Sequence, residues 1–289
     1  MIDFKNAEPV VIVGMHRSGT TILSKYLDEV GIFMGRFKDR DENNESRFFI
    51  KINNWILRQF HSEWDNVDRY IEKNENWMIN TQIEEDMKHY LNSWQLLKFT
   101  GKHRVDFNNP KVFWGWKDPR TSVTLDIWLK IFPNMKIIFT LRNPIDIAAS
   151  LKKREEKVLG KNKGVKNKIK RRLLRGNNLY QKSPSVLNID YGVNLWNKYN
   201  QAFLQNVKEV DSDRIFYFTY EDFLLNPTEE LEKLNSFLGV KDEINTSYLS
   251  SLDATRRFAF LKKPELVELY NRVKDEEFIK YWGYSNIME

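Results

Sequence analysis

Cysteine is absent from the 289 residues of this sequence. Its absence excludes disulfide bonds, thiolate nucleophiles and metal sites built on cysteine. Histidine is scarce, and its four positions lack the spacing of metal ligands, which argues against a zinc site; they are His16, His61, His89 and His103. We therefore expect no metal at the functional site.

Long apolar runs are missing as well. No stretch of about 18 apolar residues is present, so we expect no membrane-spanning helix. The N-terminal residues lack the charged start, apolar stretch and cleavage site of a signal peptide, which favours a cytoplasmic protein. Internal repeats and linkers rich in Pro or Gly are not found. With 41% hydrophobic and 14% aromatic residues the chain can bury a large core, and we expect one domain over residues 1–289.

Positive charge is concentrated in one segment. The net charge is +6, but the stretch from Lys152 to Arg175 holds twelve Lys or Arg and two Glu, so the rest carries −4. Residues 152–180 could form a mobile lid, a track for an anionic acceptor such as a polysaccharide, or a solvated helix. No aromatic residue occurs in this segment before Tyr180, so stacking on single-stranded nucleic acid is not supported. We expect no nucleic-acid partner.

Strand and helix patterns alternate along the chain. Short apolar runs predict strands at 9–14, 112–116, 136–141 and 214–219. Helical spacing of apolar residues predicts helices at 20–31, 47–60, 82–99, 122–132, 144–156, 190–210, 228–238 and 265–275. This alternation is typical of an α/β fold with a central parallel sheet flanked by helices. Ligands of such sheets bind beyond the carboxyl ends of the strands.

The segment GMHRSGTT follows the first strand at residues 14–21 and precedes a predicted helix. Gly14 and Gly19 permit a tight turn in which backbone N–H groups and the helix N-terminus face one anion. The spacing matches the first half of a Walker A loop, but Thr20 stands where that motif has Lys. Arg17 is the only cation in the loop. The loop therefore suits an anion without Mg²⁺, although an ordinary strand-to-helix turn is the alternative.

Three further polar residues follow other predicted strands. Arg142 comes directly after the strand at 136–141, with Ser150 eight residues later, and the two could bind a phosphate together. Lys117 follows the strand at 112–116 and could neutralise charge on a leaving phosphate. Simpler interpretations are a surface Arg with a helical Ser, and a Lys paired with Asp118 at a helix start.

Four segments together resemble a known family. GMHRSGTTIL, WGWKDPRTSVTLDIW, FPNMKIIFTLRNPIDIAASL and FTYEDFLLNPTEELEKLNSFLGV occur in this order between Pro9 and Gly239. They resemble the sulfotransferases that use 3′-phosphoadenosine 5′-phosphosulfate (PAPS), and the loop Arg and KDP motif resemble the bacterial branch and the tyrosylprotein sulfotransferases. The RKGxxG motif of the cytosolic enzymes is absent.

The resemblance implies a P-loop nucleotide-binding fold and a sulfuryl transfer from PAPS to a hydroxyl or amine, with 3′-phosphoadenosine 5′-phosphate (PAP) as product. It implies that Arg17 takes the place of the family's catalytic cation, that Arg142 and Ser150 grip the 3′-phosphate, and that Lys117 stabilises the transferring group. The donor-binding residues it implies are Gly14, His16, Arg17, Ser18, Gly19, Thr20, Thr21, Arg142 and Ser150.

A base must also take the acceptor's proton. The acidic segment 39–49 lies where the related tyrosylprotein enzymes place their Glu, and it offers Asp41, Glu42 and Glu45. We favour Glu45, because it directly precedes the helix expected to begin near Ser46. His61 is the alternative, whereas His16 is better explained by packing or a nucleotide contact.

The acceptor is left open by the sequence: a glycan, a small molecule and a peptide all fit. An insertion at 47–110 could form its cleft with the four tryptophans Trp55, Trp64, Trp77 and Trp94, although core packing is the favoured explanation for them. Arg256 and Arg257 could add nucleotide or acceptor contacts. Two other functions are weighed: a P-loop kinase-like phosphotransferase, which would need Mg²⁺ and ATP, and a non-catalytic module that binds polyanions. The oligomeric state is not indicated.

Overall fold

The computed structural model describes residues 2–41, 43–73, 77–101, 107, 109, 112–161, 183–241, 249 and 252–288. The candidate base Glu42 and most of the basic segment, from residue 162 onward, lie outside these residues. The chain forms two compact units, of which the first comprises Met1–Arg142 with Lys198–Arg257 and the second Asn143–Asn197 with Phe258–Glu289. One domain over the whole chain stays a prediction.

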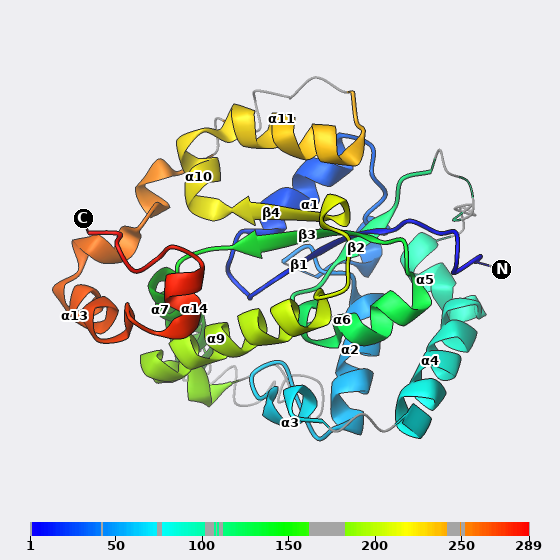
Figure 1. Cartoon of the computed structure of the whole chain (residues 1–289), viewed down its shortest axis with the longest axis horizontal. Helices are drawn as coiled ribbons and strands as arrows, with labels where there is room; N and C mark the ends of the chain where they lie inside the picture. Colours follow the sequence, from blue (N-terminus) through cyan, green and yellow to red (C-terminus); the bar gives the residue numbers. More distant parts are fainter. Residues whose placement is uncertain are drawn as a thin grey trace. The chain divides into compact units, whose positions relative to one another are not determined.

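The first unit contains a parallel sheet of four strands (Figure 1). Its strands are β1 (Val10–Gly14), β2 (Gly115–Lys117), β3 (Lys136–Leu141) and β4 (Ile215–Thr219), in the order β2-β1-β3-β4. β1 pairs with β2 on one side and with β3 on the other, so the loop after β1 lies between the carboxyl ends of its two neighbours. The predicted α/β fold with a central parallel sheet is confirmed.

Both faces of the sheet are covered by helices, which explains why β1 is buried along its whole length. On one face Val10, Ile12 and Ile138 pack in an apolar cluster with α1 (Thr20–Glu29) and α11 (Pro227–Leu238). On the other face the Trp116 ring stacks on Phe49 at 4.1 Å. Figure 1 shows α1 and α11 on one side of the sheet and α2 (Arg47–Gln59) and α6 (Thr121–Ile131) on the other.

The other α-helices described in the first unit are short except α4; they are α3 (Asp68–Ile71), α4 (Trp77–Leu91), α5 (Leu97–Thr100) and α10 (Tyr220–Leu225). The second unit holds α7 (Pro144–Lys161), α13 (Pro264–Val273) and α14 (Glu277–Tyr281), and α9 (Ile189–Asn206) runs from the second unit into the first.

Several predicted boundaries are wrong. α4 begins at Trp77 instead of 82, α7 runs to Lys161 instead of ending near 156, and α9 ends at Asn206 instead of 210. The expected single helix at 82–99 is broken after Leu91, because the Ser93 hydroxyl donates to the Tyr90 carbonyl at 2.7 Å and accepts from the N–H of Gln95 at 3.2 Å. The strand expected at 112–116 begins only at Gly115 and includes Lys117. Lys117 therefore ends the strand instead of following it.

Candidate active site

The loop between β1 and α1 has the strained backbone that its glycines predict. Gly14 and Gly19 have φ values of +129° and +100°, and Arg17 between them has +75°. A Cβ on Gly14 would lie 2.2 Å from the Thr140 hydroxyl, and one on Gly19 would lie 2.7 Å from the Tyr220 ring. Only glycine fits at these two positions. Because α1 begins at Thr20, the N–H groups at its start adjoin the loop, an arrangement that binds anions.

Ser18 ties the loop to the sheet. It is fully buried, and its hydroxyl donates to the Met15 carbonyl at 2.6 Å and lies 2.5 Å from the Thr140 hydroxyl of β3. The N–H of Gly14 donates to the Ser122 hydroxyl at 2.7 Å. These bonds hold the loop in place, so the Ser18 hydroxyl has a structural task, and its predicted contact with the donor stays a prediction.

Arg142 follows β3 and lies beside the loop, as its position in the sequence predicts. Its guanidinium donates to the carbonyls of Arg17 and Arg256, each at 3.3 Å, and lies over the Tyr220 ring at 4.6 Å. The same ring lies next to Gly19. The segment around Arg256 thus adjoins the loop. Ser150 lies on α7 in the second unit, and its pairing with Arg142 stays a prediction.

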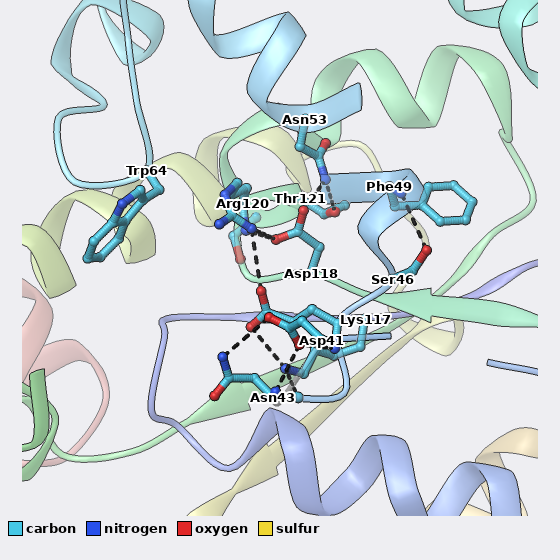
Figure 2. A network of polar contacts seen from close by, with 12 residues as sticks. Asp41, Asn43, Ser46, Phe49, Asn53, Trp64, Lys117, Asp118, Arg120 and Thr121 are labelled. Carbon is cyan, nitrogen blue, oxygen red and sulfur yellow. Dashed lines mark hydrogen bonds and ion pairs between the residues drawn. The ribbon is translucent and has the colours of Figure 1, made fainter. Parts of the chain in front are cut away.

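Two candidate catalytic residues form a buried ion pair. Lys117 is 1% exposed, and its Nζ donates to Glu45 Oε1 at 3.0 Å and to the Asn43 carbonyl at 2.7 Å. The other carboxylate oxygen of Glu45, Oε2, lies 3.4 Å from Nη1 of Arg120. Figure 2 shows this network at the end of β2. Both partners are candidates predicted from the sequence, and the fold brings them together.

A tight turn presents Glu45 to these cations. One oxygen of the Asp41 carboxylate accepts hydrogen bonds from the N–H groups of Asn43 and Glu45, both at 2.8 Å. Ser46 then caps α2, which begins at Arg47, so the predicted helix start is confirmed. The Thr21 hydroxyl donates to the Asn43 carbonyl at 2.9 Å. The first turn of α1 therefore contacts the turn that carries Glu45.

The surrounding charges set the protonation of Glu45. Burial by itself would raise its pKa, but the positive charges of Lys117, His16 and Arg120 outweigh this and lower the pKa to about 2. Burial also raises the pKa of Asp118, an effect that the charge of Arg120 reduces. The Glu45 carboxylate is therefore ionised at neutral pH. It becomes a stronger base when a neighbouring cation turns away from it.

Aromatic rings adjoin the same network. The His16 ring meets the ring of Trp64 edge-on at 4.9 Å and that of Tyr199 at 6.1 Å, and the Tyr199 hydroxyl donates to the Trp64 carbonyl at 2.7 Å. His16 thus packs among aromatic rings, one of its two predicted roles. The alternative base His61 lies exposed beyond the end of α2.

The tryptophans of the predicted acceptor cleft differ in exposure. Trp55 and Trp94 are 37% and 70% exposed, whereas Trp64 is buried; the side chain of Trp77 lies outside the described part. The function of the insertion at 47–110 as an acceptor cleft stays a prediction.

Arg120 and Asn53 were not predicted as members of this network, and Asp118 was considered only as a partner of Lys117, whereas it pairs with Arg120. Asp118 and Arg120 follow Lys117 in the segment KDPR, so a charged pair beside a candidate catalytic residue was a usable signal. Asn53 gave no signal, because a single Asn on a helix predicts no contact with a distant loop. Within the described ranges no group of three or more His, Asp or Glu is placed to hold a metal ion, and no helix is long and apolar enough to cross a membrane.

Comparisons with known proteins identify the family of the chain. The chain matches the profile of the Sulfotransferase family over residues 9–243. A sulfotransferase structure from Alicyclobacillus acidocaldarius is 17% identical and has a TM-score of 0.51, covering 95% of this chain and 92% of that one. The sulfotransferase domain from the curacin biosynthetic pathway is 16% identical with a TM-score of 0.49, covering 93% and 98%. No curated protein sequence matches. Over most of its length, this chain belongs to the Sulfotransferase family and is a sulfotransferase.

Proposed function

We propose that this sulfotransferase takes its sulfuryl group from PAPS and transfers it to a hydroxyl or amine of its acceptor. The observation that carries the proposal is the contact between the two halves of the site. The first turn of α1, next to the loop, is hydrogen-bonded through Thr21 to the Asn43 carbonyl, which also accepts from Lys117. The loop predicted to bind an anion and the carboxylate paired with Lys117 thus lie side by side.

The residues that surround the loop fit a donor with phosphates at both ends. Residues 14–21 offer backbone N–H groups, and Thr20 and Thr21 offer hydroxyls, to the 5′-phosphosulfate. Arg142 lies beside the loop with a planar guanidinium suited to bidentate phosphate binding, and we assign it to the 3′-phosphate together with Ser150. PAPS supplies an activated sulfuryl group when bound.

Three residues act on the reacting groups in this proposal. The acceptor oxygen or nitrogen forms a bond to sulfur while the bond between sulfur and the phosphate oxygen of the nucleotide breaks. Glu45 accepts the proton that the acceptor loses. Arg17 and Lys117 stabilise the negative charge that develops on the leaving oxygen. A cytoplasmic location remains a prediction of the sequence.

The test is calorimetric titration of the purified chain with PAP, with AMP and Mg·ATP as parallel titrants. We expect tight binding of PAP without a metal ion, and binding at least tenfold weaker for AMP, which lacks the 3′-phosphate. Arg142→Ala should remove most of that difference. Preference for Mg·ATP would favour the kinase-like alternative. Equal binding of all three nucleotides, with an affinity that falls steeply as salt is added, would favour the non-catalytic module that binds polyanions.

A further inference from the structure

We propose that Arg120 is a positioning residue for Glu45, which keeps that carboxylate oriented and ionised when Lys117 turns to the transferring sulfuryl group. The inference rests on the proposed function, because it takes Glu45 as the base and Lys117 as the group that meets the donor. Arg120 itself touches neither reacting partner in this proposal.

The carboxylate of Glu45 is held at both oxygens. Nζ of Lys117 lies 3.0 Å from Oε1, and Nη1 of Arg120 lies 3.4 Å from Oε2. The two cations are nearly buried, with side chains 1% and 12% exposed. If Lys117 leaves Oε1 to meet the donor, Arg120 is the cation that stays in contact with Glu45. The carboxylate then keeps one fixed oxygen and presents the other to the acceptor.

Arg120 is itself fixed, which a positioning residue must be. Oδ1 of Asp118 accepts from Nη1 of Arg120 at 2.8 Å and from its backbone N–H at 3.1 Å. Oδ2 of Asp118 accepts from Nδ2 of Asn53 at 2.7 Å. Figure 2 shows the contacts from Asn53 through Asp118 to Arg120, and the last link is the contact of Arg120 with Glu45.

Asn53 anchors this chain of contacts to the core. It is fully buried, and its Nδ2 also donates to the Thr121 hydroxyl at 2.9 Å. Its Oδ1 accepts from the hydroxyl of Thr124 and from the indole N–H of Trp128, both at 2.7 Å. All four hydrogen-bonding positions of the amide are therefore used. The orientation of Arg120 is set by α2 and α6, which pack against the sheet.

The guanidinium also separates two buried carboxylates. Nη1 of Arg120 contacts both Asp118 and Glu45, so its removal leaves two negative charges facing each other away from water. One of the two must then take up a proton more readily. Our proposal requires that Glu45 takes up this proton. The hydrogen bond that Asn53 donates to Asp118 favours the ionised form of Asp118.

Other charges face Glu45 and must be counted. Lys117, His16 and Arg120 are the cations that lower its pKa, while Asp41 and Asp118 are the neighbouring acids. Loss of Arg120 leaves the other two cations in place. An opposite charge within about 4–6 Å changes proton affinity by about tenfold or more, so we expect Glu45 to bind a proton at least tenfold more tightly in Arg120→Gln.

The first experiment measures Glu45 directly and needs no acceptor. The full chain is labelled with carbon-13 at the glutamate carboxyl carbons, and the Glu45 signal is assigned by its loss in Glu45→Gln. The signal is followed by NMR from pH 8 down to about pH 2 in the wild type, Arg120→Gln, Arg120→Lys and Arg58→Gln. Arg58 lies on the same helix as Asn53, and its exposed ion pair with Glu63 at 3.7 Å makes it the matched control.

We expect Glu45 to titrate at higher pH in Arg120→Gln than in the wild type and in Arg58→Gln, with Arg120→Lys in between. An unchanged Glu45 titration in Arg120→Gln would overturn the proposal. If only Asp118 took up the added proton, Glu45 would likewise stay unchanged, and Arg120 would be a structural partner of Asp118. Should Arg120→Gln fail to fold, the titration of Glu45 in Arg120→Lys is the test. A Glu45 titration identical to that of the wild type would then overturn the proposal.

A second measurement separates this inference from the proposed function. Release of PAP from PAPS, with water as acceptor, is followed against pH, and PAP binding is measured by calorimetry. Arg120→Gln should bind PAP like the wild type but turn over PAPS at least tenfold more slowly, and the acid limb of its rate should move to higher pH. If PAP does not bind the wild type, the proposed function fails, while the NMR result still decides whether Arg120 controls Glu45.

Discussion

Glu45 and Lys117 stand 72 residues apart in the chain and meet as a buried ion pair, with Oε1 and Nζ 3.0 Å apart. The residue assigned to accept a proton and the residue assigned to stabilise the leaving group neutralise each other in this pair. The pair removes the cost of burying either charge alone, which for an unpaired buried ion is large. The same pairing makes Glu45 a weak base until Lys117 is drawn elsewhere.

Removing Lys117 should therefore affect both activity and stability. We expect Lys117→Met to lower PAPS turnover by about 100- to 1,000-fold, as for loss of one transition-state donor. It should also lower the free energy of unfolding by about 3 kcal/mol or more, because Glu45 loses its nearest cation. Urea unfolding and PAP release measure the two effects.

A double variant separates these effects. Glu45→Gln with Lys117→Met should recover much of the lost stability but none of the activity, because the buried charge is gone while the catalytic groups remain absent. Lys130→Met, an exposed position on α6, is the control. If Lys117→Met alone kept the unfolding free energy of the wild type, Lys117 would not be needed to compensate the buried charge of Glu45.

The depressed pKa of Glu45 predicts a pH dependence of stability. Its folded value of about 2 lies below the ordinary 4.5, so its contribution is present above pH 4.5 and is lost as the pH falls towards 2. The contribution is about 3 kcal/mol. The difference in unfolding free energy between the wild type and Glu45→Gln should shrink between pH 5 and pH 3. A difference independent of pH would show that Glu45 has an ordinary pKa.

Gly14 should tolerate no side chain. In Gly14→Ala the new Cβ meets Thr140 at 2.2 Å, and the residue keeps a φ of +129°. Gly31→Ala is the matched control, since Gly31 also has a positive φ, +82°, but has no atom within 4 Å of its ideal Cβ. We expect Gly31→Ala to cost about 1–2 kcal/mol from backbone strain alone. Gly14→Ala should cost clearly more and abolish PAP binding. Equal costs would mean that the loop can shift away from β3.

The Tyr220 ring should support the donor site through Arg142. It lies under the guanidinium at 4.6 Å and against Gly19, so Tyr220→Leu removes a cation–π contact worth about 0.5–2 kcal/mol. PAP affinity should fall severalfold, and Tyr220→Leu should add little to the loss that Arg142→Ala already causes. Tyr281→Leu, which changes a 63% exposed tyrosine in the second unit, should leave PAP affinity unchanged. Additive losses in the double variant would contradict a shared role.

Local sequence patterns predicted the fold and the loop that forms one half of the candidate site. The strand at 136–141 is predicted at its observed bounds, because its buried run of apolar residues is a local property. Gly14 and Gly19 indicated the backbone geometry of the loop, since a positive φ excludes most side chains. The helix predicted at 82–99 failed at Ser93, where a side chain competes for backbone hydrogen bonds and ends the helix.

The sequence alone determined the strands, the helices that cover them, the loop after β1 and the residue types of the site, because these follow from periodicity and local sterics. It also placed Lys117 at the carboxyl end of the sheet. Only the tertiary structure decided that Lys117, Arg120 and Glu45 share one network, and that Asn53 holds it. Such contacts depend on how α2 and α6 pack against the sheet, and that packing is a property of the folded chain, which no local pattern encodes.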